Sequence, residues 1–323
     1  MNSEKGERFM NSREMIIYDY KPGYVLTGGR VIALGLFDGM HKGHRLLLDS
    51  AKKIARERSL PFTVFTFRSE SLKKGSGALY STEEKLELMK EIGVESVILA
   101  DFSTLANVAA PEFIKDILVS EMGCEVAVCG FDFRFGSGAL GNAELLKETL
   151  NELDKEVIIE NEHTIDGEKI STTRIKSLLG EGDIKRAKDC LGFPYFITAR
   201  VEHGRGEGRS LGFPTANLYS DGLIHLKRGV YSCVAVIDGE LISGVVNVGT
   251  CPTFDERSVH AEVNLEDFSG NIYGKTVRIY FSSFIREDKR FNTKEELIMQ
   301  IIIDKNKAKE ENGDISWLEI GLR

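Results

Sequence analysis

The sequence has no long apolar run, no block of basic residues and few cysteines. Because it lacks the roughly 18–20 consecutive apolar residues of a membrane helix, we expect no membrane span. Lys and Arg number 42 against 50 Asp and Glu, and this net charge of −8 argues against a general nucleic-acid binder, which needs clustered cations. Residues 1–13 are charged and have no apolar centre, so we expect no secretory signal and a cytoplasmic protein.

The five cysteines are an odd number, widely spaced, and form no CxxC pair. This pattern suits reduced thiols and excludes a disulfide scaffold and a structural zinc site. The remaining composition is that of an ordinary globular protein, and 323 residues suffice for two domains.

The first half of the chain alternates short β-branched or aromatic runs with stretches of helical periodicity. We expect strands at residues 30–36, 62–67, 95–100, 125–129 and 156–160, and helices at residues 43–58, 81–92, 111–122 and 142–153. Ser81 with Glu84 forms a capping box, and Pro111 stands at a first helical position. This alternation predicts right-handed βαβ units and a doubly wound parallel sheet with helices on both faces.

The second half loses the helical period after Pro194. We expect strands at residues 196–202, 229–237, 241–248, 260–265 and 275–284, with a hairpin turn at Asp238-Gly239, and a closing helix at residues 293–309. This pattern predicts a small antiparallel β-barrel with a C-terminal helix. We therefore divide the chain into a loose tail (residues 1–14), a doubly wound domain (15–187) and a barrel domain (188–323).

The first candidate site is residues 35–44 (GLFDGMHKGH), which follow the first predicted strand and open the first long helix. The carboxyl edge of a parallel sheet binds nucleotides, and a helix N-terminus favours phosphate. His41 and His44 can each donate a hydrogen bond to charge developing on a phosphate, and Gly43 lets a ligand approach the backbone. The pattern is neither GxGxxG nor GK[ST], which argues against dinucleotide oxidoreduction and kinase-type hydrolysis here. The plain alternative is a glycine turn with two surface histidines.

A second anion-binding element, residues 171–176 (STTRIK), follows the last predicted strand of the sheet. Hydroxyls of Ser171 and Thr172 at a helix start, followed by the Arg174 guanidinium, form a clamp for phosphate. An ordinary helix cap with an exposed arginine is the alternative. Two clamps around one polyphosphate suit nucleotidyl transfer, which depends on positioning and charge stabilisation rather than on a protein nucleophile.

A third candidate element, residues 204–217 (GRGEGRSLGFPTAN), joins two strands of the predicted barrel. Thr215 and Asn217 offer oxygens one strand repeat apart, hence on one face, which suits Mg²⁺ beside a phosphate. Backbone N–H groups of the glycine-rich part can wrap phosphates, and the candidates there are Gly206, Gly208 and Gly212. Without the residues that follow, these glycines would equally suit a flexible hairpin.

The motifs resemble, over residues 30–309, the bacterial bifunctional riboflavin kinase/FAD synthetases. The resemblance to the FAD synthetase half rests on residues 35–44, 130–136 (GFDFRFG) and 171–176. The resemblance to the riboflavin kinase half rests on GFPTAN at 212–217, GVY at 229–231, NVGTCPTF at 247–254, IYGK at 272–275, and IRE at 285–287 with Phe291.

For the first half, the resemblance implies adenylyl transfer from ATP to FMN, giving FAD and pyrophosphate. It assigns the ATP site to Gly35, Phe37, Asp38, Gly39, His41, Gly43, His44, Ser171, Thr172 and Arg174, with His41, His44 and Arg174 catalytic. It places Asp132 and Arg134 at the flavin and adenine pocket. The family usually carries a loop with Pro and His after the second strand; here residues 67–71 read FRSES, and Arg68 is the candidate replacement contact.

For the second half, the resemblance implies phosphorylation of riboflavin by ATP, giving FMN. Glu262 would act as general base on the ribityl hydroxyl that attacks the γ-phosphate, although taken alone it is an ordinary strand carboxylate. Thr215 and Asn217 would hold ATP and Mg²⁺, and Arg286 and Phe291 would bind the flavin. The family usually has histidine where Asn264 stands.

The leading hypothesis is a bifunctional enzyme with Mg²⁺ at both sites and riboflavin, FMN and ATP as its small-molecule partners. We infer no obligate protein partner. One alternative is an enzyme with a single working half, the riboflavin kinase being the one retained. Another is a non-catalytic flavin-binding regulator; Glu262 and the two phosphate clamps argue against it, because a binder needs neither.

Overall fold

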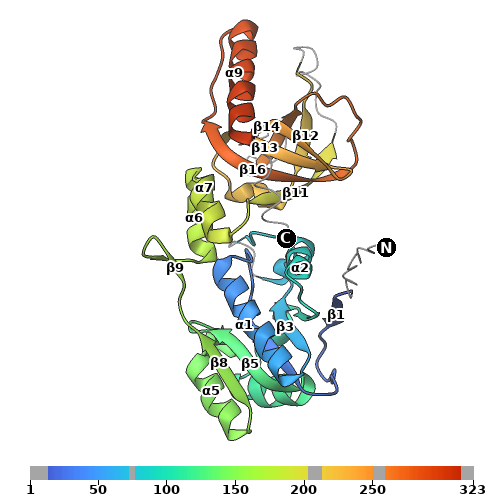
Figure 1. Cartoon of the computed structure of the whole chain (residues 1–323), viewed down its shortest axis with the longest axis vertical. Helices are drawn as coiled ribbons and strands as arrows, with labels where there is room; N and C mark the ends of the chain where they lie inside the picture. The colour runs from blue at the N-terminus through green and yellow to red at the C-terminus, as the bar shows by residue number, and fades with distance from the viewer. Residues whose placement is uncertain (1–13, 73–76, 203–212, 251–258, 314–323) are drawn as a thin grey trace, which may run out of the picture. The chain divides into compact units, whose positions relative to one another are not determined.

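The computed structural model describes residues 14–72, 77–202, 213–250 and 259–313 (Figure 1). The chain forms two compact units, which we describe separately. The first comprises Met1–Leu36, Leu47–Phe67 and Ile92–Glu160, and the second Phe37–Leu46, Arg68–Glu91 and Asn161–Arg323. Within the described residues, no helix has the length and apolar character needed to cross a membrane.

The first unit contains a six-stranded sheet in the order β1-β4-β3-β2-β5-β8. All its neighbouring strands pair in parallel, which confirms the predicted sheet. The strands are β1 (Ile16–Asp19), β2 (Arg30–Leu34), β3 (Phe62–Phe67), β4 (Ser96–Ala100), β5 (Cys124–Gly130) and β8 (Glu156–Glu160). Every residue of β2 and β4 is buried, as expected for a parallel sheet covered on both faces.

Three helices begin and end close to the predicted positions: α1 (Lys42–Arg58), α2 (Thr82–Glu91) and α5 (Ala143–Glu152). The short α3 (Phe102–Leu105) was not predicted, and only α4 (Ala110–Glu112) is α-helical at the start of the predicted helix at residues 111–122. The capping box of α2 is confirmed, because Ser81 N–H donates to the Glu84 carboxylate (2.9 Å) and Glu84 N–H to the Ser81 hydroxyl (3.2 Å). One difference is that Phe113–Glu121 is a π-helix, whose apolar side chains still face the sheet core.

Two chain segments leave the sheet of the first unit at neighbouring strand ends. Strands β3 and β4 lie on one side of β2, and β5 and β8 on the other. Leu34 of β2 is in register with Cys129 of β5, so residues 35–36 and 130–131 emerge side by side. Such a switch in strand order is where open α/β sheets bind ligands.

The second unit contains the predicted antiparallel barrel, closed in the order β11-β12-β15-β14-β13-β16. Its strands are β11 (Phe196–Glu202), β12 (Ala216–Tyr219), β13 (Gly229–Ile237), β14 (Glu240–Thr250), β15 (Val259–Leu265) and β16 (Thr276–Arg286). Asp238 and Gly239 both have positive φ, which is the backbone of the expected hairpin turn. Helix α9 (Lys294–Asn312) packs on β13, β14 and β16 (Figure 1).

Besides α2, the second unit holds a small hairpin and two further helices directly before the barrel. The hairpin is β9 (Thr164–Ile165) with β10 (Glu168–Lys169), and the helices are α6 (Thr172–Glu181) and α7 (Ile184–Leu191). As predicted, Ser171 caps α6: its hydroxyl accepts a hydrogen bond from the Arg174 N–H (3.2 Å). Helix α7 ends at Gly192, which has φ +85°.

Candidate functional site

The turn that leads into α1 is strained and held by packing. Phe37 and Met40 have φ of 51° and 43°, in the left-handed region that residues with side chains rarely adopt. Both side chains are fully buried, so the core fixes this conformation. A Cβ on Gly39, whose φ is +87°, would lie 2.8 Å from Leu79 Cδ1, so this position needs glycine.

His41 and His44 stack on each other, with ring centroids 3.6 Å apart and planes 14° from parallel. The backbone N–H of His44 donates to Nδ1 of His41 (3.3 Å), so a neutral His41 carries its proton on Nε2. Burial, followed by the charges of His41 and Lys85, lowers the pKa of His44 well below its ordinary value. His44 is therefore a neutral imidazole at pH 7.

Asp38 ties this turn to two other segments of the second unit. Its Oδ1 accepts from the Leu79 N–H (2.8 Å), and its Oδ2 lies 3.4 Å from the Lys176 ammonium. Its main-chain carbonyl accepts the Thr172 hydroxyl (2.7 Å). The structure thus brings the two anion-binding elements predicted from sequence, residues 35–44 and 171–176, to one place.

Arg174 is turned toward the β9–β10 hairpin. Its NH1 donates to the carbonyls of Ile165 (3.2 Å) and Glu168 (2.9 Å), and its NH2 lies 2.9 Å from the Glu168 carboxylate. These contacts fix the hairpin against the first turn of α6. The role of Arg174 as an ATP ligand stays a prediction.

Lys85 is a charged residue at this site that the sequence analysis missed. Its side chain is only 2% exposed, on the buried face of α2. Burial lowers its pKa to about 8, while the carboxylates of Asp38 and Glu70 act in the opposite direction. The sequence did contain a signal for this burial. Lys85 lies three and four residues before Leu88 and Met89, so it shares their side of the predicted helix, and both are buried.

The residues after β3 are anchored to the start of α2. The Glu70 carboxylate accepts from the Thr82 N–H (3.0 Å) and also from its hydroxyl. The Arg68 carbonyl accepts from the N–H (3.1 Å) and the hydroxyl (2.8 Å) of Ser71. The FRSES segment is thus a defined turn that leaves the Arg68 side chain half-buried.

Asp132 and Arg134, the other residues predicted at the flavin and adenine pocket, lie in the first unit and are exposed. They follow β5, at the strand end beside residues 35–36. Of the neighbouring aromatics, Phe135 packs on Phe113 in the core (centroids 5.3 Å apart), whereas Phe131 is 43% exposed. Phe131 is therefore the more exposed of these two aromatic side chains.

The barrel site rests on a row of three polar residues across adjacent strands. Glu262 of β15 pairs in register with Asn217 of β12 on one side and with Asn247 of β14 on the other. Residues directly opposite one another in antiparallel strands point to the same face, so the three side chains share one face of the barrel wall.

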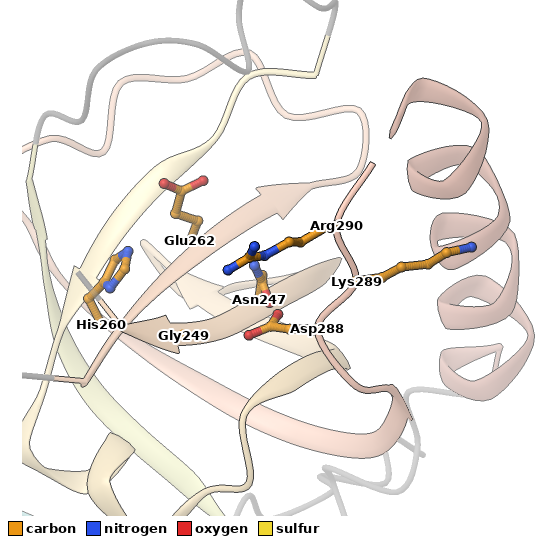
Figure 2. Close-up of a pocket in the computed structure, with 7 residues that line it drawn as sticks. All are labelled: Asn247, Gly249, His260, Glu262, Asp288, Lys289 and Arg290. Atoms are coloured by element: carbon orange, nitrogen blue, oxygen red, sulfur yellow. The ribbon is translucent and has the colours of Figure 1, made fainter. Parts of the chain in front are cut away.

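A cavity of about 430 Å³ opens on this face (Figure 2). In Figure 2 the Arg290 side chain extends over Asn247 toward the Glu262 side, whereas the Lys289 ammonium points away from it. Nδ1 of His260 is shielded from solvent and has no hydrogen-bond partner within the described part of the chain. The lining residues are Asn247, Gly249, His260, Glu262, Asp288, Lys289 and Arg290. The cavity is thus lined by acidic and basic side chains, and the carboxylate of Glu262 is exposed there.

Asn264 holds the segment that carries Thr215. Its side-chain amide donates to the Pro214 carbonyl (2.8 Å), and its buried Oδ1 has no partner among the described residues. Asn217 is 8% exposed and Thr215 half-buried. The predicted phosphate-wrapping glycines, Gly206, Gly208 and Gly212, lie outside the described residues.

Arg286 forms a buried ion pair with Asp304 of α9. Its Nε and NH2 donate to Oδ2 of Asp304 (3.0 and 2.8 Å), and Asp304 is 3% exposed. The Phe291 ring lies 5.8 Å from the Arg286 guanidinium. This pair ties the start of the segment that supplies Asp288 and Arg290 to α9, and flavin binding by Arg286 and Phe291 stays a prediction.

The family comparisons match the two halves separately. Residues 26–174 match the family model described as FAD synthetase, and residues 191–311 match the one described as riboflavin kinase. A crystal structure of a macrolide-efflux protein from Streptococcus pneumoniae has a TM-score of 0.82 and 33% identity to this chain, and covers 91% of this chain and 99% of that one.

Relatives that carry both names on one chain are also similar to this protein. A bifunctional riboflavin kinase/FMN adenylyltransferase from Bacillus subtilis (strain 168) is 34% identical over 86% of this chain and 91% of the relative. A protein of the same name from Escherichia coli (strain K12) is 34% identical over 87% of this chain and 92% of the relative. Since both family models match in this order and the relatives align over nearly their whole length, the chain belongs to the family of bifunctional riboflavin kinase/FAD synthetases.

Proposed function

We propose that this chain makes FAD in two steps, phosphorylating riboflavin to FMN at the barrel and adenylylating FMN at the turn before α1. The observation that carries the proposal is that two separate polar sites are assembled on one chain of this family, each at a motif for which the sequence predicts phosphate binding. One is the junction of Asp38 with Thr172, and the other is the row of Asn217, Glu262 and Asn247 beside the cavity. Domain limits of 15–187 and 188–323 are part of this proposal, supported by family matches to residues 26–174 and 191–311.

At the barrel, Glu262 is the proposed base. Its exposed carboxylate faces the cavity and takes the proton of the riboflavin hydroxyl as the oxygen attacks the γ-phosphate of ATP. Arg290, whose side chain reaches toward the same space, provides charge for the transferring phosphoryl group (Figure 2). Arg286 and Phe291, on the segment that borders the cavity, bind the flavin.

Mg²⁺ fits the oxygen donors of this site. Thr215 and Asn217 offer neutral oxygens of the kind that Mg²⁺ accepts, and Asn264 fixes the segment that carries them. Among the described residues, no group of three or more His, Cys, Asp or Glu could hold a metal ion. The ion would therefore be held mainly by ATP phosphates, and when bound it neutralises their charge.

At the other site, His41 and His44 donate hydrogen bonds to the phosphates of a second ATP. The structure supports this role because both imidazoles lie at the N-terminus of α1, whose N–H groups and dipole favour anions. The attacking oxygen comes from the phosphate of FMN, and pyrophosphate leaves. Gly35, Phe37, Gly39, Gly43 and Ser171 shape the ATP site, and Arg68, Asp132 and Arg134 contact the flavin or the adenine.

We propose that the protein acts in the cytoplasm. The support is that Cys124, Cys129, Cys190 and Cys233 are all unpaired and buried, while Cys251 lies outside the described residues. We do not transfer the macrolide-efflux description of the Streptococcus pneumoniae structure to this chain, because both matched family models describe enzymes of flavin metabolism.

The test is chromatography of flavins after incubation of the chain with riboflavin, excess ATP and Mg²⁺. We expect FMN followed by FAD from the wild type, no product from Glu262→Gln, and FMN alone from His44→Ala. FMN without FAD in the wild type would leave an enzyme with one working half. Flavin binding without any product would leave the non-catalytic regulator.

A further inference from the structure

A third histidine lies beside the turn that carries His41 and His44. His163 immediately precedes β9, and its carbonyl accepts the Ile170 N–H (2.9 Å), which closes the base of the β9–β10 hairpin. A Cβ placed on Gly43 would lie 4.0 Å from His163 Cδ2, so the imidazole borders the first turn of α1. All of these residues belong to the second unit.

The His163 ring presents an unused polar atom at this position. Its Nε2 is covalently bonded to Cδ2, the ring atom nearest to a Cβ placed on Gly43. This Nε2 is shielded from solvent and has no hydrogen-bond partner among the residues that the structure describes. An unpaired buried polar atom is costly, and a native structure that keeps one near a site needs an explanation.

The surroundings of His163 favour an anion as the missing partner. Gly43 is in the first turn of α1, where backbone N–H groups point outward and the helix dipole is positive. Within the described part of the chain, His41, His44 and His163 do not form a group that could hold a metal ion. The His163 ring, which carries the shielded Nε2, thus borders the first turn of α1, where the helix end favours negative charge.

We propose that His163 is a substrate-binding residue of adenylyl transfer, whose Nε2–H donates a hydrogen bond to the triphosphate of ATP. The inference rests on the proposed function of this site. Arg174 is then the positioning residue for His163, because its NH1 holds the carbonyls of Ile165 and Glu168 in the same hairpin. His163 lies outside both motifs from which the sequence analysis predicted the ATP site.

The test measures FAD formation from supplied FMN at varied ATP, with riboflavin phosphorylation measured on the same preparations. We expect His163→Ala to lower kcat/KM for ATP in FAD formation by about 10- to 100-fold, the worth of one hydrogen bond to a charged group. His163→Gln keeps an N–H donor and should recover most of this loss. Thr164→Ala, an exposed neighbour in the same hairpin, should stay within about threefold of wild type. Riboflavin phosphorylation should be unchanged in all three variants.

The outcomes separate this inference from the proposed function. No FAD from the wild type would overturn the proposed function itself. FAD from the wild type with an unchanged kcat/KM in His163→Ala would overturn only the inference. A His163→Gln variant no better than His163→Ala, or a Thr164→Ala variant equally impaired, would also overturn it, because the loss would then come from the shape of the hairpin.

Discussion

The hydroxyl of Thr172 donates a 2.7 Å hydrogen bond to the main-chain carbonyl of Asp38, across 134 positions of sequence. It joins the N-terminus of α6 to the strained turn before α1. Two helix N-termini, each able to attract an anion, are thereby held at one place. This contact joins the two elements that the sequence analysis assigned to the ATP site.

Removal of the Thr172 hydroxyl should therefore impair FAD formation selectively. We expect Thr172→Val to lower kcat/KM for FAD formation roughly 5- to 10-fold, since it loses one hydrogen bond worth about 1 kcal/mol and leaves a carbonyl unpaired. Thr172→Ser should retain the activity. The matched control is Thr173→Val, which alters the exposed neighbour. Equal losses in Thr172→Val and Thr173→Val would contradict the prediction.

Lys85 should make stability depend on pH in the alkaline range. Its pKa in the folded state, about 8, lies below the ordinary 10.5, so the unfolded chain binds the proton more tightly. The cost of burying the charge is fully present below pH 8 and disappears as the pH rises to about 10.5. This group alone should stabilise the fold by roughly 3 kcal/mol over that range. Urea unfolding of wild type and Lys85→Met at pH 7.5 and pH 10 gives the change in unfolding free energy with pH for each protein. If Lys85 titrates normally, this change will be the same in both.

His44 should remain uncharged well below neutral pH. Burial and the positive charges nearby lower its pKa, so its histidine NMR signal should not titrate between pH 8 and pH 6. Lys85→Met removes one of these charges and should raise the pKa of His44. The acid limb of FAD formation should then move to higher pH. Comparison with His44→Ala identifies the resonance, and a signal that titrates near pH 6.5 in the wild type would refute the expectation.

Asn264 should matter for riboflavin phosphorylation and not for FAD formation from supplied FMN. Asn264→Ala loses the bond to the Pro214 carbonyl, next to Thr215, the proposed ligand of ATP and Mg²⁺. We expect KM for ATP in the kinase reaction to rise about 5- to 10-fold, the worth of roughly 1 kcal/mol. Asp267→Ala, in the exposed turn after β15, serves as control. Similar KM values in wild type and Asn264→Ala would show that the Pro214 contact is dispensable.

The Arg286–Asp304 pair should contribute far more to stability than a surface pair. Asp304→Ala leaves a largely buried guanidinium unpaired, which should cost about 3 kcal/mol of unfolding free energy. Lys275→Met breaks the exposed pair with Asp238 and should cost less than about 1 kcal/mol. Thermal unfolding of both variants gives the comparison, and equal shifts in Tm would contradict it.

The sequence by itself determined most of the elements and their order. Strands β3, β11 and β13 begin and end at the predicted residues, because β-branched and aromatic runs between turn residues are a local signal. Strands β1 and β12 were missed. Each has only four residues, too few for a period to show, and the sheet that they join is formed by strands distant in sequence.

The features of the candidate sites likewise divide into those that the sequence predicted and those that only the structure revealed. Motif spacing predicted His41, His44 and Ser171, since each belongs to a short string with its own chemistry, whereas Glu262 was assigned only by the family resemblance. Only the tertiary structure decided that Thr172 bonds to Asp38, that Lys85 is buried and that Arg174 turns to the hairpin. Burial and contacts between distant residues arise from packing, and no local pattern encodes which charged side chain the fold will enclose.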